Sequence, residues 1–360
     1  MAGKKTPGLT KIKGIWHIDK QIAGQRICKS TGTGKLAEAE RYLSRVVEET
    51  RNAQLYGIRP ERSFEQAAAR YILENQHKRS IRNDIQRLEN ILPYIGTLPI
   101  EKIHRGSLNE WVEYRQSQGI APATINHGIK IVRRILNLAQ DEWIDENGLS
   151  WLHHAPKLKT LPVTNQRKPY PLSWEEQTLL FEQLPPHLRE MALFAVNTGC
   201  RDSEICQLRW EWEVEVVALN ASVFVIPGQY VKNGDDRLVV LNETASNVIE
   251  KQRGIHDKRV FTYKGEPVTR MMNSAWLRAR NAVSLPMVRV HDLKHTFGRR
   301  LRSAGVGFED RQDLLGHRST RMTTHYSAAE LSNLLTSANK VCLKGDETQQ
   351  LVVLRSPSLD

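Results

Sequence analysis

The first 60 residues combine strand-like and helix-like patterns of apolar and polar positions. Residues 14–19 and 25–30 predict two short strands around a turn at residues 22–24. Residues 36–50 carry apolar side chains three and four positions apart, which is typical of a helix. We therefore expect a small sheet with one helix over residues 1–60.

The next 90 residues show helical spacing almost throughout. Apolar positions fall on one face in four stretches, residues 64–72, 81–92, 108–115 and 124–143. Pro122 supplies a start signal for the last stretch, and Asn147-Gly148 supplies a stop. The pattern predicts a helical bundle over residues 61–152.

A polar, basic and proline-bearing stretch, residues 153–169, predicts a linker. Ser173-Trp-Glu-Glu then has the pattern of a capping box, so a third domain is predicted over residues 170–338, with a tail at 339–360. The third domain mixes helical patterns with strand-like ones. We expect a multidomain, mainly α protein with small β-sheets (α+β), in which this domain is mixed α/β. Its β-prone runs are residues 222–226, 229–232 and 237–241.

The charge balance points to a polyanionic partner. The chain has 52 Lys and Arg against 40 Asp and Glu, a net charge of +12, and residues 1–60 hold 12 basic against 5 acidic residues. No apolar run approaches the roughly 20 residues of a membrane-spanning helix, and no secretory signal follows the first lysines. The four cysteines form no CxxC pair, so a cytoplasmic, reducing setting is expected, with no membrane association.

A basic stripe lies within the helical bundle. It comprises Lys78, Arg79, Arg82 and Arg87. A stripe of this kind suits a DNA-facing surface, but charge runs are more often solvated helix faces. Both interpretations stand at this point.

A helix predicted at residues 191–196 runs into Thr198-Gly199, which breaks it just before Arg201. Asp202 or Ser203 is the expected cap of the next helix. Glu204, three residues after Arg201, is the expected partner of that arginine. The segment on its own is compatible with an ordinary surface ion pair.

Asn233-Gly234 between two β-prone runs predicts a tight hairpin with Lys232 at its tip, where an ammonium group can reach a ligand. A solvated turn lysine is the simpler alternative.

Three basic side chains are expected on one face of a helix near residue 291. His291, Lys294 and His295 stand at positions i, i+3 and i+4, with His291 or Asp292 as the cap. A zincin site would need Glu directly after the first histidine, and the chain has Asp292 there. We expect no metal and no cofactor.

His317 stands nine residues before Tyr326 in the last informative segment. The four segments TGCRDSEICQL, YVKNGDDRLVVL, HDLKHTFGRRL and LLGHRST…HY resemble, in order and spacing, the signature of the tyrosine recombinase (phage integrase) family. The resemblance covers about residues 170–330. Residues 1–60 and 61–152 look like that family's arm-binding and core-binding domains. The three-part layout is most similar to integrases of temperate phages and integrative elements.

The resemblance implies a chemistry for the residues that match the signature. Tyr326 would attack the scissile phosphate to form a 3′-phosphotyrosyl bond, while Arg201, His291 and His317 stabilise the charge on the phosphoryl oxygens. Lys232 would protonate the leaving 5′-oxygen. Glu204 would support the cluster.

Lys294 departs from the family pattern, which usually has arginine at this position. Lysine keeps the charge but loses the bidentate geometry of a guanidinium. The loss of one charge-assisted hydrogen bond, about 1.5–3 kcal/mol, would slow the chemical step by roughly 10- to 150-fold.

The resemblance also implies partners and alternatives. The partners are duplex DNA attachment sites, a homotetrameric synaptic complex, and possible accessory factors, namely a host DNA-bending protein and an excisionase. The enzyme would integrate or excise a phage or mobile element without metal or ATP. An impaired remnant that only binds DNA is one alternative, and a type IB topoisomerase is another.

Overall fold

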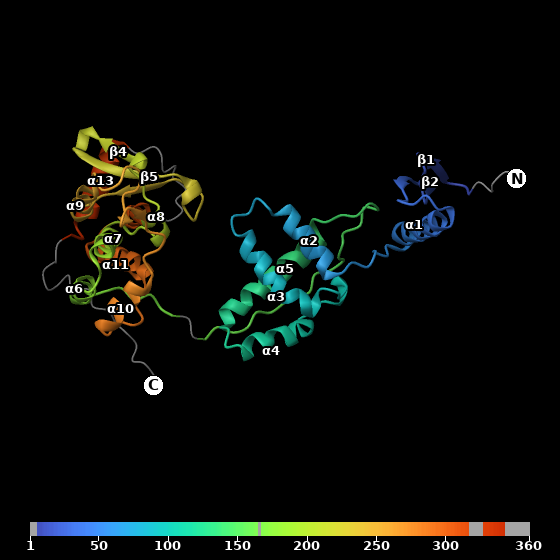
Figure 1. The fold of residues 1–360 in the computed structure, drawn as a ribbon, viewed down its shortest axis with the longest axis horizontal. Coiled ribbons are helices and arrows are strands. Elements are labelled where there is room, and N and C mark those ends of the chain that lie inside the picture. Colours follow the sequence, from blue (N-terminus) through green and yellow to red (C-terminus); the bar gives the residue numbers. More distant parts are fainter. Residues whose placement is uncertain (1–5, 165–166, 317–326, 343–360) are drawn as a thin grey trace. The chain divides into compact units, whose positions relative to one another are not determined.

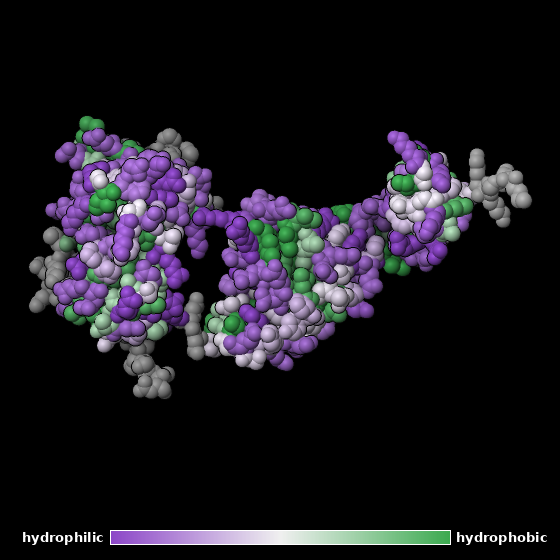
Figure 2. Space-filling view, viewed as in Figure 1, coloured by the Kyte–Doolittle hydropathy of each residue, from purple (hydrophilic) through white to green (hydrophobic). Residues whose placement is uncertain are grey.

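The computed structural model describes residues 6–164, 167–316 and 327–342. The chain divides into two compact units, residues 1–166 and 167–360 (Figure 1). Hydrophilic residues cover most of the visible face of each unit, and hydrophobic residues appear there in scattered patches (Figure 2). No helix in the described ranges is long and apolar enough to span a membrane.

The N-terminal part of the first unit is a three-stranded antiparallel sheet with one helix on it. The elements are β1 (Leu9–Ile12), β2 (Ile15–Ile22), β3 (Gln25–Ser30) and α1 (Leu36–Tyr56). The two predicted strands and the helix are confirmed. The sequence did not predict β1, because this edge strand buries a single residue, Leu9, and therefore lacks an alternating pattern.

The rest of the first unit is a helical bundle. Its helices are α2 (Phe64–Glu74), α3 (Ile81–Ile95), α4 (Asn109–Ser117) and α5 (Pro122–Asp141), with 3-10 turns at Ile100–Lys102 and Gly106–Leu108. All four predicted helices are confirmed. Each turns its apolar side chains into one shared core, which also takes in Leu152 and Leu158 from the following segment.

The second unit packs helices against a small sheet. Its helices are α6 (Trp174–Glu182), α7 (Pro186–Thr198), α8 (Asp202–Cys206), α9 (Glu243–Gln252), α10 (Ser274–Ala282), α11 (Val290–Ser303), α12 (Phe308–Leu315) and α13 (Ala328–Asn339). The expected Ser173 capping box opens α6, with the Ser173 hydroxyl accepting from the Glu176 amide. The centre of the unit is α7, which is buried on nearly all sides and contacts α9 and α11.

The strands of the second unit form an antiparallel sheet in the order β4-β5-β6 and a separate hairpin. They are β4 (Glu213–Val216), β5 (Ala221–Ile226), β6 (Arg237–Val240), β7 (Thr262–Tyr263) and β8 (Glu266–Pro267). Further 3-10 turns lie at Trp210–Trp212, Val217–Leu219 and Gly228–Tyr230. Residues of β5 and β6 pack with α11, α12 and α13 in a second core of this unit.

One predicted strand is wrong. Residues 229–232 are not a strand, because the chain leaves β5 at Pro227 and forms a 3-10 turn over Gly228–Tyr230. The hairpin therefore joins β5 to β6 through residues 227–236 rather than through a two-residue Asn-Gly turn. The Gly228 amide donates to Asp236 Oδ1 at 2.7 Å, and a Cβ on Gly228 would lie 2.1 Å from the Gly234 carbonyl oxygen. These contacts close the loop and override the local strand preference.

Candidate active site

A pocket of about 460 Å³ in the second unit gathers four of the predicted site residues: Arg201, Lys232, His291 and Lys294. They come from the start of α8, the β5–β6 loop and α11, and are thus up to 93 positions apart in the sequence. The titratable side chains that line this pocket are all basic, and no carboxylate is among them. A pocket of this composition attracts an anion such as a phosphate.

The backbone at the end of α7 places Arg201 at the pocket. Gly199 ends α7 in the left-handed conformation, with a φ of 62°. Arg201 itself is the N-cap of α8, and Glu204 accepts its backbone N–H at 2.8 Å and its Nη1 at 2.6 Å. The expectation that Asp202 or Ser203 caps this helix is wrong. Asp202 Oδ1 instead accepts the amide of Met271, at 2.8 Å.

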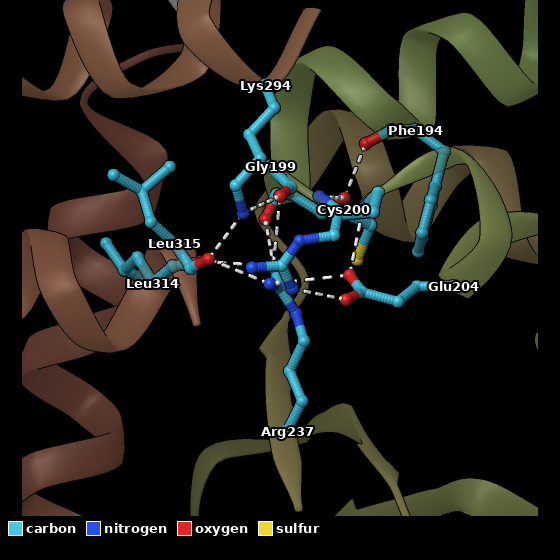
Figure 3. A network of polar contacts seen from close by, with 10 residues as sticks. Phe194, Gly199, Cys200, Glu204, Arg237, Lys294, Leu314 and Leu315 are labelled. Atoms are coloured by element: carbon cyan, nitrogen blue, oxygen red, sulfur yellow. Dashed lines mark hydrogen bonds and ion pairs between the residues drawn. The ribbon is translucent and has the colours of Figure 1, made fainter. Parts of the chain in front are cut away.

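Glu204 is the buried carboxylate behind the pocket, with a side chain that is 1% exposed. Its second ion pair is with Arg237, whose Nη1 lies 3.4 Å from Glu204 Oε2 (Figure 3). Burial alone would raise the pKa of Glu204. The charge of Arg237 and the hydrogen bonds from Arg201 outweigh burial, so this pKa lies below its ordinary value. The ionised Glu204 therefore holds Arg201 in place at neutral pH.

Lys294 lies on the pocket wall but is 6% exposed. Its Nζ donates to the carbonyl of Gly199 at 2.7 Å and to that of Leu315 (Figure 3). Burial, together with the charges of Arg237 and Arg201, lowers the pKa of Lys294 to about 6. An uncharged amine still has two N–H groups, which matches the two carbonyl acceptors.

The two histidines of α11 stand side by side, as their spacing predicts. The rings of His291 and His295 are 4.9 Å apart and perpendicular. Loss of surrounding water lowers the pKa of both imidazoles, and for His295 it outweighs the opposing charge of Asp292. The start of α11 differs from the prediction, because Arg289 is the N-cap and Asp292 lies in the first turn, where it accepts the Arg289 amide at 2.8 Å.

Lys232 reaches the pocket from the β5–β6 loop, as a side chain exposed to solvent. The loop is longer than the predicted Asn-Gly turn, but Lys232 lies in the turn at its middle, where the Gly234 amide donates to the Val231 carbonyl at 3.3 Å. The aromatic contact between Tyr230 and Trp212, with ring centroids 4.9 Å apart, anchors the chain two residues before Lys232. The lysine is thus carried on a short anchored segment.

His317 and Tyr326 lie outside the described residues. The described chain ends at Gly316, directly after α12, and resumes at Ser327, the N-cap of α13. The Ser327 hydroxyl accepts the Glu330 amide at 3.2 Å in a capping box. The positions of both predicted residues stay predictions.

Several basic residues of the pocket were not among the predicted site residues. They are His295, Arg299, Arg302 and Arg311. A sequence signal existed for the first three, because they continue the α11 face of His291 and Lys294 at helical spacing. Arg237 was also missed, although an arginine inside the apolar run RLVV is a sign of a buried polar contact.

The basic stripe in the bundle belongs to the connection between α2 and α3, which carries Lys78 and Arg79, and to α3, which carries Arg82 and Arg87. Lys78 and Arg87 both pair with buried Asp84, at 2.7 and 2.8 Å, so that carboxylate offsets part of their charge. Arg79 and Arg82 are exposed. In the described part of the chain, no three His, Cys, Asp or Glu side chains gather as they would around a metal ion.

Comparison with known proteins identifies a family domain in the second unit. Residues 175–332 match the model of the phage integrase family. The integrase of Salmonella phage P22 is 27% identical over 357 residues, which is 88% of this chain and 89% of that protein. The tyrosine recombinase XerC of Rhodospirillum centenum is 26% identical, covering 83% and 85% of the two chains.

Solved structures agree on the fold. A lambda integrase dimer bound to a COC' core site matches with a TM-score of 0.53 and 14% identity, over 90% of this chain and 95% of that one. The Tn1549 transposon integrase, residues 82–397, matches with a TM-score of 0.55 and 19% identity, over 75% and 98%. Residues 175–332, which hold the four signature segments, are thus a domain of the phage integrase family, and the integrase and XerC relatives are similar to the chain over more than four fifths of its length.

Proposed function

We propose that the chain is a site-specific DNA recombinase that cuts and rejoins duplex DNA through a 3′-phosphotyrosyl bond to Tyr326. The observation that carries this proposal is the basic pocket, in which Arg201, Lys232, His291 and Lys294 meet and no carboxylate is present. Such a pocket neutralises the charge that builds on a phosphoryl group during in-line attack. Because integrases are among its relatives, we take the reaction to be integration or excision of a phage or mobile element.

Each pocket residue has a distinct part in the proposed chemistry. Tyr326 attacks the scissile phosphorus, and its phenolic oxygen replaces the 5′-oxygen of the next nucleotide. The guanidinium of Arg201 binds the non-bridging oxygens, and His291 and His317 donate hydrogen bonds to them. Lys232 gives its proton to the leaving 5′-oxygen.

Two further residues support this chemistry from behind. Glu204 holds the Arg201 guanidinium and its backbone N–H, which orients the fork toward the pocket. Lys294 bonds to the Gly199 and Leu315 carbonyls, so its first role is to join the α7–α8 turn to the end of α12. The bidentate phosphate contact of the usual arginine is replaced by this backbone contact.

The phosphotyrosyl linkage conserves the energy of the broken phosphodiester bond. A 5′-hydroxyl from a partner strand can attack it with Tyr326 as the leaving group, which restores a phosphodiester and the free tyrosine. The number of phosphodiester bonds is unchanged over the cycle, so ATP is not required. Strand exchange rather than hydrolysis follows.

We further propose an assembly and a division of labour along the chain. Residues 1–60 bind arm-type DNA, 61–152 bind the core site, 153–169 link, 170–338 carry catalysis, and 339–360 form a tail. Separate hydrophobic cores in the sheet module, the bundle and the second unit support this division, although Leu158 of the proposed linker belongs to the bundle core. A tetramer of lambda integrase bound to a Holliday junction supports a four-protomer synapse, on duplex DNA in the bacterial cytoplasm. A host DNA-bending protein and an excisionase complete the proposed set of partners.

The test is a covalent trapping assay. Supercoiled plasmid carrying the DNA that flanks the coding sequence is incubated with protein, and denaturing detergent then reveals linked protein on a gel. Wild type is expected to form an adduct that Tyr326→Phe does not. Tyr263→Phe serves as the matched control, because Tyr263 stacks on His187 away from the pocket. An adduct that persists in Tyr326→Phe would contradict the proposed nucleophile.

The same assay separates the two other functions. A protein that only binds attachment sites would shift the DNA without forming an adduct, and the integrase and XerC relatives do not favour it. A topoisomerase would relax any supercoiled plasmid regardless of sequence. Relaxation or recombination restricted to the plasmid with flanking DNA is the result expected of a recombinase.

A further inference from the structure

We propose that Arg237 is a positioning residue for recombination, which sets Arg201 and the end of α12 in a fixed geometry through one buried guanidinium. The inference rests on the proposed function and adds a residue to it. Arg237 does not line the pocket, so it acts through its neighbours and not on the phosphate. Nothing in the signature segments singled it out.

The first observation is the set of backbone groups that Arg237 holds. Its Nη1 donates to the Leu315 carbonyl at 2.8 Å, and its Nη2 donates to the carbonyls of Gly199 at 3.1 Å and Thr198 at 3.3 Å (Figure 3). These carbonyls lie at the C-terminal ends of α12 and α7. A helix C-terminus leaves carbonyls unpaired and carries partial negative charge, so one cation between two such ends stabilises both.

The second observation is the link to Arg201. Glu204 forms ion pairs with two arginines. Its Oε2 lies 3.4 Å from Arg237 Nη1, and its Oε1 lies 2.6 Å from Arg201 Nη1. Arg237 is 1% exposed in its side chain, and water therefore does not screen this contact. A displacement of the Arg237 guanidinium moves Glu204 and, with it, the Arg201 fork.

The third observation is steric. The chain leaves α12 through Gly316, in the left-handed conformation with a φ of 58°. A Cβ at this position would lie 2.3 Å from Arg237 Nη1. The backbone after α12 is therefore seated directly on the guanidinium, just before the segment that begins with His317.

Lys294 supplies a second hold on the same two helix ends. It donates to the carbonyls of Gly199 and Leu315, both of which Arg237 also contacts. The two side chains differ in their access to the pocket, because only Lys294 lines it. The planar fork of Arg237 reaches four backbone carbonyls, those of Thr198, Gly199, Leu314 and Leu315, and the Glu204 carboxylate. A lysine cannot match this geometry.

Two variants with matched controls test the inference. Arg237→Lys keeps the charge and removes the fork, and Gly316→Ala places a methyl group against the guanidinium. Arg300→Lys controls for the first, because Arg300 is also buried in this unit and bonds Gln177, outside the pocket. Gly305→Ala controls for the second, because Gly305 has a similar φ of 70° with no atom within 4 Å of its would-be Cβ.

The readout separates positioning from stability. We measure the single-turnover rate constant and the final amount of covalent complex on plasmid carrying the flanking DNA, together with DNA affinity. Arg237→Lys and Gly316→Ala are expected to lower the rate constant by about 100-fold, with affinity and final adduct near wild type. Both controls are expected to keep the wild-type rate constant. An unchanged rate constant, or less adduct at an unchanged rate constant, would overturn the inference.

Hydrogen–deuterium exchange tests the clamp without DNA. In Arg237→Lys, amides of residues 196–206 and 308–316 are expected to exchange faster together, and Arg300→Lys is expected to leave these segments unchanged. Unchanged exchange in Arg237→Lys would refute the clamp itself. A wild type without a Tyr326-dependent adduct would instead contradict the proposed function, and the exchange data would still decide whether Arg237 holds the two helix ends.

Discussion

Each unit of the chain contains a buried carboxylate that is held by two cations. In the bundle, Asp84 accepts from Lys78 and Arg87 and from the Tyr71 hydroxyl at 2.9 Å. In the second unit, Glu204 accepts from Arg201 and pairs with Arg237. The local chemistry is similar, and the burial of the cations differs.

The cations of Asp84 reach water, with side chains 42% and 36% exposed for Lys78 and Arg87. Asp84 thus neutralises part of a surface stripe. The cations of Glu204 are far less exposed, and the carboxylate lies behind a pocket wall whose titratable side chains are all basic. The ion pairs of Asp84 therefore reduce the positive charge of a surface stripe. Those of Glu204 instead hold in place an arginine that lines an anion-binding pocket.

The largest effect is expected at the pocket, from Lys232→Ala. Loss of the proton donor should slow covalent complex formation by roughly 10²- to 10⁴-fold, as measured in single-turnover assays on the plasmid described above. A substrate with sulfur at the leaving 5′ position should restore the rate, because a thiolate leaves without a proton. Lys264→Ala, at an exposed turn in the same unit, is the control. Failure of the sulfur substrate to rescue Lys232→Ala would contradict its role as general acid.

The next largest effect is expected on stability, where substitutions of Glu204 and Asp84 should lower the free energy of unfolding by different amounts. Glu204→Gln leaves buried Arg237 without its counter-charge, and we expect a loss of about 3–5 kcal/mol in the free energy of unfolding. Asp84→Asn leaves cations that can turn to water, and about 1–3 kcal/mol is expected. Urea unfolding of each variant measures both values. Equal losses would show that cation exposure does not distinguish the two sites.

Acid should remove the contribution of Glu204 to the free energy of unfolding. Folding lowers the pKa of Glu204, so its stabilising effect is fully present above the unfolded-state pKa of about 4.3 and is lost as the pH falls through the folded-state pKa. The gap in unfolding free energy between wild type and Glu204→Gln should therefore narrow below about pH 4. A gap that stays constant down to the acid limit of folding would argue against this ionised pair.

A second pH effect, of the same sign but at higher pH, is expected from Lys294. Folding lowers its pKa to about 6, so between pH 6 and its unfolded value of about 10.4 the folded state binds fewer protons than the unfolded state. Stability then rises with pH in this window, by up to about 1.4 kcal/mol per pH unit, and Lys294→Met should flatten the slope. The pKa of Lys78 is raised, chiefly by its hydrogen bond to Asp84, so Lys78→Met should leave the slope between pH 6 and 9 unchanged. Parallel slopes for wild type and Lys294→Met would refute the low pKa.

The smallest effect is expected on the bundle stripe. Arg82→Ala should weaken DNA binding uniformly across sequences and reduce the slope of log affinity against log salt by about 1. Fluorescence anisotropy at several salt concentrations measures this slope, with Lys264→Ala as the control. An unchanged slope would make the stripe an ordinary solvated face.

Local patterns were sufficient for most elements of the fold. The four bundle helices and the α6 capping box follow from periodicity and from side chains within three or four residues of one another. Predictions from local patterns failed where a contact from outside the short segment outweighs its local preference. Residues 229–232 have strand propensity, yet Asp236 and Gly234 close the loop around Gly228. Asp202, a good cap by type, is instead turned to the Met271 amide.

The sequence by itself determined which residue types the site contains. Order and spacing of the four segments were enough to name Arg201, Lys232, His291 and Lys294, because these segments carry a family signature. Tertiary structure alone brought them into one pocket, buried Lys294, and placed Arg237 between two helix ends. The physical reason is that a buried cation is held by whatever carboxylates and carbonyls the fold brings to it, and those partners lie up to 95 positions away along the chain.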